Sequence, residues 1–162
     1  MSEVQPTVIT RVFDAPRERV WKAWTEAKEI QKWWGPKDFT APEVRIDFTE
    51  GGKYVYCMRG SVAPGVPPQD LWSAGTFEKI VPMEKIVVTD SFADKDGNFI
   101  PPSAYGMGDM PEVMHLTITF EDTEDGKTKL TLTYTDDIPE DHKKDMLAGW
   151  NQSLDKFSKA LS

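Results

Sequence analysis

Only one long segment of the chain, residues 139–161, carries apolar residues at helical spacing. Its charged side chains fall on the other positions, which predicts an amphipathic α-helix with one apolar stripe. The stripe consists of Met146, Leu147, Trp150, Leu154, Phe157 and Leu161. Pro139 is suited to begin the helix, because a residue of the first turn needs no partner for its N–H. We interpret the mid-helix Gly149 as a point of close approach between backbone and sheet, with a merely tolerated glycine as the alternative.

Residues 42–135 show a different pattern, in which apolar and polar positions alternate as in half-buried β-strands. Turns rich in Gly, Pro and Asp separate the alternating stretches. We expect strands at residues 43–48, 54–58, 71–81, 85–92, 114–120 and 129–134, and an earlier one at residues 4–13. The residues of the first strand leave open which of its faces points inward. Because the helix stripe has to be buried, these strands are expected to form an antiparallel sheet curled around the C-terminal helix.

Two short helices are expected between the first strand and the rest of the sheet. Asp14-Ala15-Pro16 ends that strand and begins the first helix. The second helix is expected over residues 26–34, where Gly35-Pro36 ends it. Both would close one end of the space around the long helix. Residues 93–113 lack regular patterning, and loops of this length inside a compact domain usually carry function.

Length and charge narrow the class of protein. A chain of 162 residues with 39% hydrophobic residues is long enough for a substantial core, and we expect residues 1–162 to form a single domain. The net charge of −8 at pH 7 argues against nucleic acid or an anionic membrane as a partner, because both bind basic surfaces. No apolar run is long enough to cross a membrane, and the N-terminal residues do not resemble a signal peptide. We therefore expect a cytoplasmic protein.

Few residues are suited to catalysis or metal binding. The single cysteine, Cys57, lies in an apolar strand without a neighbouring histidine and is expected to be a buried thiol. The two histidines, His115 and His142, fall on polar positions and are expected to be solvent-exposed. One cysteine and two distant histidines give no zinc spacing, and no Gly-x-Ser-x-Gly motif is present. We expect no catalytic residue, no metal and no cofactor.

Carboxylates are frequent, but the sequence does not show whether any of them enters a cavity. Those that could reach a pocket mouth are Glu43, Asp47, Glu78 and Glu112, and a surface position is expected for each. Residues 94–98 resemble a calcium loop, and Gly126-Lys127-Thr128 resembles the end of a phosphate loop. Each lacks a residue that its motif requires, so both are assigned to turns.

Six tryptophans exceed what a core of this size needs. Four of them, Trp33, Trp34, Trp72 and Trp150, are expected to gather where helices and strand ends frame an opening. As a set they indicate a cavity with apolar walls and a few polar tips. The alternative is that each of them fills the core.

A series of short motifs carries a family resemblance over nearly the whole chain, from about Thr7 to Leu161. The motifs are Arg11, Phe13, Ala15-Pro16, Val20-Trp21, Ala23-Trp24-Thr25, Trp33-Trp34-Gly35-Pro36, Gly51-Gly52, Gly75-Thr76-Phe77 and Gly149-Trp150. In this order they resemble the bacterial single-domain members of the family named for the activator of the heat-shock protein 90 ATPase, within the START-like (SRPBCC) helix-grip superfamily. The resemblance implies an α+β fold. In it, a curved antiparallel sheet of six or seven strands grips a long C-terminal helix, with two short helices after the first strand.

The resemblance also implies a cavity between helix and sheet. We expect it to bind a small hydrophobic or aromatic molecule without catalysis, in a role such as stress response. The candidate lining is Trp33, Trp34, Tyr56, Met58, Trp72, Phe92, Tyr105, Met114, Trp150 and Leu154. The segment 103–114, with its Met and Tyr residues, is the candidate lid because methionine adapts to varied shapes.

Two further functions stay open, because one fold can serve several activities. A chaperone is the first alternative partner, although the eukaryotic activators bind theirs through an additional N-terminal domain for which 162 residues leave no room. The second alternative is a cyclase or hydrolase of the polyketide cyclase type, whose catalytic residues match nothing in this sequence. Monomer and homodimer are both compatible with the residues.

Overall fold

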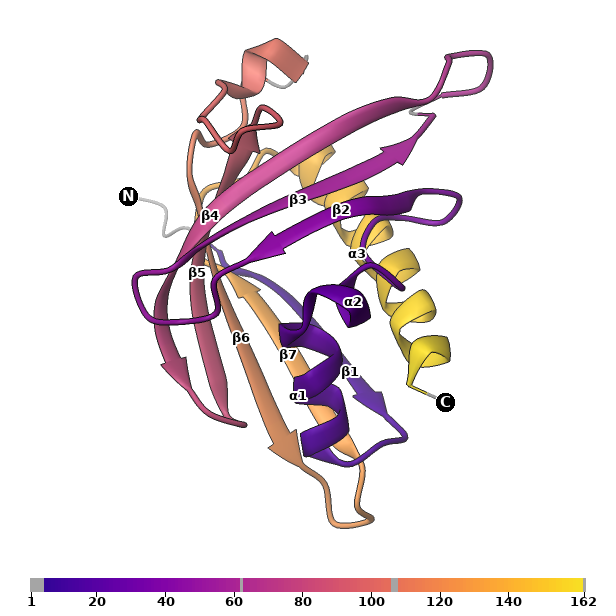
Figure 1. The fold of residues 1–162 in the computed structure, drawn as a ribbon, viewed down its shortest axis with the longest axis vertical. Coiled ribbons are helices and arrows are strands. Elements are labelled where there is room, and N and C mark those ends of the chain that lie inside the picture. Colours follow the sequence, from indigo (N-terminus) through magenta and orange to yellow (C-terminus); the bar gives the residue numbers. More distant parts are fainter. Residues whose placement is uncertain (1–4, 62, 106–107, 162) are drawn as a thin grey trace.

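A computed structural model describes residues 5–61, 63–105 and 108–161 of the chain. Within them, seven antiparallel strands form one sheet in the order β1-β7-β6-β5-β4-β3-β2. The elements are β1 (Thr7–Phe13), α1 (Arg17–Thr25), α2 (Ala27–Ile30), β2 (Thr40–Ile46), β3 (Lys53–Gly60), β4 (Gln69–Val81), β5 (Lys85–Ala93), the 3-10 helix η1 (Pro102–Tyr105), β6 (Met114–Asp122), β7 (Thr128–Tyr134) and α3 (Glu140–Ala160). Figure 1 shows α3 running along the open side of the curled sheet. The expected α+β helix-grip fold is confirmed.

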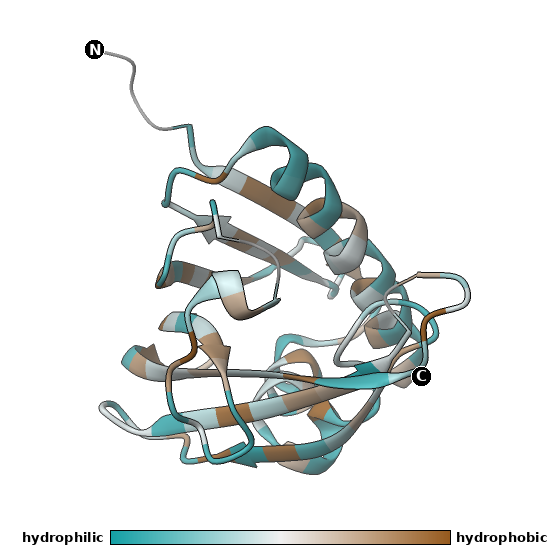
Figure 2. Cartoon of the chain, turned by 90° about the horizontal axis from the view of Figure 1, so that it is seen from above, coloured by the Kyte–Doolittle hydropathy of each residue, from teal (hydrophilic) through white to brown (hydrophobic). Residues whose placement is uncertain are grey.

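Alternation along the strands builds the inner face of the sheet. Ile86 and Val88 of β5 are buried, as are Leu130 and Leu132 of β7, whereas the residues between them keep part of their surface. Figure 2 shows the same alternation as brown and teal bands along the strands. A strand with this pattern can bury one face only, so the apolar face turns toward α3.

The inward face of β1, which the sequence left open, is the one that carries Ile9 and Phe13. Val8 and Val12 lie on the outer face and are 51% and 54% exposed. β1 lies at one edge of the sheet and pairs only with β7, from Thr7 opposite Tyr134 to Phe13 opposite Thr128. This register sets Phe13 against α3, where its ring lies 4.9 Å from that of Phe157.

Strand β2 differs from the sequence prediction of residues 43–48. It begins at Thr40, and a bulge between Thr40 and Glu43 shifts its register against β3. Phe48 lies beyond the strand end, where its ring contacts those of Phe77 at 5.1 Å and Trp21 at 5.7 Å. The alternating pattern continued past the strand because Phe48, which follows the strand end, still packs part of its side chain against the core.

Helix α2 spans one turn, and not the expected residues 26–34. The chain leaves the helix after Ile30, and the two tryptophans that follow enter different surroundings. Trp33 is 1% exposed, and its indole N–H donates to the Ala23 carbonyl at 2.9 Å. Trp34 is half-buried. A buried indole needs a partner for its N–H, and Ala23 of α1 supplies it.

The C-terminal half of α3 carries the residues of this helix that are buried against the curled sheet. Phe157 is fully buried, and its ring lies 5.0 Å from Trp33 and 5.5 Å from Trp24. About two turns earlier on α3, the ring of Trp150 stacks on that of Trp24, with centroids 6.0 Å apart and an angle of 9° between the planes. Met146 and Leu147, in the N-terminal half, are only partly buried. The helix is thus anchored by rings at one end and less tightly covered at the other.

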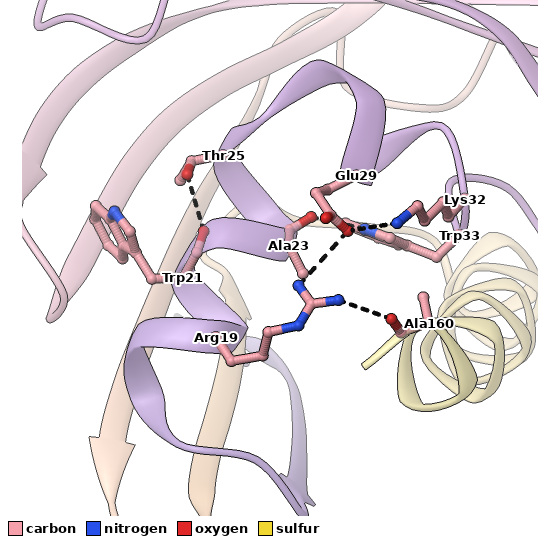
Figure 3. A network of polar contacts seen from close by, with 8 residues as sticks. All are labelled: Arg19, Trp21, Ala23, Thr25, Glu29, Lys32, Trp33 and Ala160. Carbon is pink, nitrogen blue, oxygen red and sulfur yellow. Dashed lines mark hydrogen bonds and ion pairs between the residues drawn. The ribbon is translucent and has the colours of Figure 1, made fainter. Parts of the chain in front are cut away.

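Polar contacts also hold the anchored end. The Lys156 ammonium donates to the carbonyls of Pro36 at 3.2 Å and Phe39 at 2.9 Å, and its partial burial lowers its pKa. Arg19 of α1 donates to the Ala160 carbonyl at 2.9 Å, as Figure 3 shows, and pairs with Glu29 at 3.5 Å. A guanidinium at the C-terminal end of α3 meets carbonyls that lack helical partners and the negative end of the helix dipole.

Replacing Phe157 by alanine should lower the free energy of unfolding by about 3–5 kcal/mol, because it empties a site between several aromatic rings. The measurement is urea denaturation followed by circular dichroism. Asn151→Ala is the matched control on the exposed side of the same helix, with an expected change within about 0.5 kcal/mol. A loss below about 1 kcal/mol for the Phe157 variant would show that α3 is not part of the core.

Candidate functional site

A pocket of about 280 Å³ lies between the N-terminal half of α3 and the inner face of the sheet. Residues from β3, β4, β5, β6 and β7 form its base, and Trp34-Gly35-Pro36 closes one side. A second hollow of about 480 Å³ lies over α1. Five of the eight residues around that hollow are polar or charged, including Arg19 and Lys22. The first pocket is therefore the one with apolar walls.

The pocket lining brings together six of the ten residues expected from the sequence. They are Trp34, Met58, Trp72, Phe92, Met114 and Trp150. Further apolar surface comes from Leu71, Met110 and Met146. That these side chains contact a ligand stays a prediction.

The other four expected residues lie outside the lining. Trp33 and Leu154 are 1% exposed and belong to the core, as does Tyr56, whose ring packs against Trp34 at 4.8 Å. The ring of Tyr105 packs against that of the lining residue Phe92, with centroids 5.2 Å apart, and its hydroxyl donates to the Ala93 carbonyl at 2.8 Å. Trp33 and Tyr56 both pack against the ring of Trp34, which itself lines the pocket.

The expected lid, residues 103–114, is only partly described, because Gly106 and Met107 lie outside the described residues. Met110 and Met114 line the pocket, and both are buried. Asp109 joins this segment to α3 through a contact of 2.6 Å between its Oδ1 and His142 Nε2. Thioether side chains from this segment therefore form part of the pocket wall.

Asp90 is a pocket residue that the sequence interpretation missed. It follows Ile86 and Val88 on the inner face of β5, so alternation alone places a carboxyl group among apolar positions. The Tyr54 hydroxyl donates to Asp90 Oδ1 at 2.9 Å and approaches the Thr89 carbonyl at 2.8 Å. Burial raises the pKa of the Asp90 carboxyl to about 6, although the bonds from Tyr54 and the Ser91 amide favour its charged form.

Tyrosine hydroxyls surround this carboxyl group. Burial, and then the charge of Asp90, raises the pKa values of Tyr54, Tyr56 and Tyr134 well above the ordinary range, so all three stay protonated. Tyr134 lines the pocket, and its oxygen accepts a hydrogen bond from the Trp150 indole N–H at 3.0 Å. This contact ties β7 to α3 directly at the pocket wall.

Gly75 makes the contact between Tyr54 and β5 feasible. A Cβ at this position would lie 1.8 Å from the Thr89 carbonyl oxygen and 2.7 Å from the Tyr54 hydroxyl. Both distances are far below van der Waals contact, so β4 can approach β5 here only as glycine. Gly75 therefore has a steric role next to the carboxyl group.

His142 corrects the expectation of a solvent-exposed side chain. The first turn of α3 lies over the pocket, so His142 is a lining residue and its side chain is 17% exposed. Its Nε2 contacts Asp109, and its Nδ1 is buried without a hydrogen-bond partner among the described residues. His115 is exposed as expected, and its Nδ1 pairs with Asp136 at 2.9 Å.

Cys57 is fully buried as predicted, and burial raises the pKa of its thiol to about 11.

Gly149 does not mark a close approach to the sheet: a Cβ there would have the Pro36 Cγ as its nearest neighbour, at an ordinary 3.7 Å. Gly149 instead lines the pocket. Its lack of a side chain contributes open space beside Trp150.

Among the described residues, no three His, Cys, Asp or Glu side chains group as metal ligands do. None of the described helices is both long and apolar enough to cross a bilayer. What the pocket offers is mainly apolar and aromatic surface, with a carboxyl group at Asp90 and an imidazole at His142.

The chain belongs to the family described as "Activator of Hsp90 ATPase homolog 1-like protein", which matches residues 14–162. This confirms the resemblance inferred from the sequence motifs. No curated protein matches the sequence.

Solved structures of bacterial proteins share the fold. A protein from Chromobacterium violaceum is 26% identical with a TM-score of 0.72, covering 96% of each chain. A protein from Nitrosomonas europaea is 19% identical with a TM-score of 0.73, covering 99% of this chain and 96% of that one. The AHSA1 protein from Silicibacter pomeroyi is 19% identical with a TM-score of 0.73, covering 97% of each chain. At such identities, the last two establish the fold alone.

Asp90→Asn should stabilise the protein at neutral pH, and the gain should depend on pH. The folded pKa of about 6 lies above the unfolded value of 3.8, so the folded state holds the extra proton between these values. The contribution of Asp90 to stability therefore falls as pH rises through this window. The variant's advantage should grow by about 2–3 kcal/mol between pH 4 and pH 7 and then level off.

Urea denaturation at a series of pH values measures this difference. The exposed turn residue Asp96 supplies the control variant Asp96→Asn, for which no such pH-dependent gain is expected. An advantage of the Asp90 variant that stayed constant between pH 4 and pH 7 would contradict the assignment.

Proposed function

We propose that the pocket binds a small hydrophobic or aromatic molecule and releases it unchanged. The single observation that carries the proposal is the pocket of about 280 Å³ whose walls are formed mainly by Trp, Phe and Met side chains. Apolar concave surface with a few polar groups is the usual form of a small-molecule site. Membership of a family with the helix-grip fold supports the same conclusion.

The expected affinity is modest. A ligand that buries about 300 Å² of apolar surface gains about 7 kcal/mol at roughly 25 cal/mol/Å². Loss of translational and rotational freedom takes back at least about 4 kcal/mol of this. At most about 3 kcal/mol then remains, which corresponds to dissociation constants in the millimolar range unless specific hydrogen bonds add to the apolar term.

Tryptophan fluorescence titrated with flavonoids, lipids and sterols tests the proposal, because Trp34, Trp72 and Trp150 line the pocket. At least one class of compound should shift or quench the emission with saturation. Gly149→Phe should weaken that binding at least about tenfold, since the ring would occupy the pocket. Gly149→Ala is the matched control, which should bind normally and gain up to about 1 kcal/mol of stability from its higher helix propensity. Equal binding by both variants, or no saturable signal with any class, would contradict the proposal.

A second function, an enzyme of the cyclase or hydrolase kind, is favoured by one specific observation. Asp90 and His142 line the same pocket, and Nδ1 of His142 has no hydrogen-bond partner among the described residues. Mass spectrometry of the ligands recovered from the titrations separates the two functions. A binder returns each compound unchanged, whereas an enzyme converts one of them at a rate that falls in His142→Ala.

A chaperone partner is supported only by the family description, which names activation of the Hsp90 ATPase. If the chain acts in this way, it should be retained by the immobilised bacterial chaperone and should raise the ATPase rate of that chaperone. Neither effect is expected if the pocket is the functional site.

A further inference from the structure

We infer that the pocket selects molecules that join a hydrophobic or aromatic body to a protonated amine, with the ammonium group bound by the Asp90 carboxylate. This inference rests on the proposed function, because it names the ligand class of the same pocket. Three features of the site carry it: a carboxylate without a cation, walls made of aromatic rings, and negative charge at the rim.

Asp90 is an unpaired charge in an apolar setting. Its neighbours on the inner face of β5 are Val88, which is 4% exposed, and Phe92. No Lys, Arg or His of the described residues forms an ion pair with it, while carboxylates on the outer surface, such as Asp70 with Arg59, have such partners. Burying a carboxylate is costly unless a cation or hydrogen bonds compensate. The ammonium group of a ligand would act as the positively charged partner of Asp90.

The carboxylate is fixed in place and still able to accept further hydrogen bonds. Tyr54 and the Ser91 amide donate to it, and an ionised carboxylate has about four acceptor positions. Asp90 is part of the pocket surface, so a ligand can reach it. The pKa of about 6 leaves it ionised at neutral pH, although it is buried. The site is thus preorganised for a donor with positive charge.

The walls suit a cation as well as an apolar body. Trp34, Trp72, Phe92 and Trp150 line the pocket together with Tyr134. Aromatic faces attract ammonium groups by about 0.5–2 kcal/mol, and the effect is larger where water is excluded. A neutral ligand gains burial and ring stacking from the same walls, but no cation–π attraction.

Negative charge at the rim acts in the same direction. Asp145 lines the pocket on α3, and Asp109 contacts His142 beside it. The chain as a whole carries a net charge of −8. A field of this sign raises the local concentration of cations and disfavours ligands with a carboxylate, such as fatty acids.

Three probes of nearly the same size test the inference: 2-naphthylmethylamine, 2-naphthylmethanol and 2-naphthoate. Isothermal titration calorimetry at pH 7.5 should give an affinity for the amine at least about tenfold higher than for the alcohol, with 2-naphthoate the weakest. In Asp90→Asn the preference for the amine over the alcohol should fall to about threefold or less, the part that the aromatic walls and the rim charges still supply. Asp96→Asn, which removes one surface charge outside the pocket, should keep the tenfold preference.

The outcomes separate this inference from the proposed function. Equal affinities for amine and alcohol in the natural protein overturn the inference and leave the apolar binding function standing. No binding by any of the three probes overturns both. A tenfold preference that survives undiminished in Asp90→Asn overturns the assignment to Asp90, whether or not it disappears in Asp145→Asn. Because the comparison of probes on the natural protein needs no variant, the inference can fail even if Asp90→Asn does not fold.

Discussion

The packing of α3 into the curled sheet is the interaction on which the rest of the structure depends. Phe157 provides its centre, in contact with rings from β1, α1 and the turn after α2. Trp150, which lies nearer the N-terminus of α3, extends this aromatic contact by stacking on Trp24. These large rings hold the C-terminal half of the helix close to the strands, while Gly149 and the partly buried Met146 leave space along the N-terminal half. The pocket is thus a consequence of unequal packing along one helix.

A second constraint acts inside that space. Asp90 occupies an inward position that apolar residues fill elsewhere on β5, and burial raises the pKa of its carboxyl group to about 6. Three protonated tyrosines and the glycine at position 75 shape the environment around it. A structural core has no need of such a carboxylate, since apolar residues of similar size stabilise a core at least as well. The presence of Asp90 in a pocket with aromatic walls is the observation on which the proposed binding of a ligand cation rests.

The sequence predicted most closely those elements whose signal is local and strong. The helix expected at residues 139–161 spans Glu140–Ala160, and the hairpin expected from residues 114 to 134 forms β6 and β7. The sequence prediction was wrong where the same residue pattern occurs both in the core and at the pocket, or both in solvent and at the pocket. Trp33 and Trp34 are adjacent and equally apolar, yet one is bonded to Ala23 inside the core and the other faces the pocket. His142 has charged neighbours in the sequence, which suggested solvent, while the placement of α3 turned it toward the pocket.

Periodicity, turn residues and motif order were enough to predict most of the elements and the family, because short stretches of the chain carry those signals. The contacts that give the site its chemistry join distant residues: Tyr54 with Asp90 through the β3, β4 and β5 register, and Asp109 with His142 across the pocket rim. Strand register and the placement of α3 decide which of the distant polar groups meet. Those are long-range packing outcomes, and no local pattern encodes them.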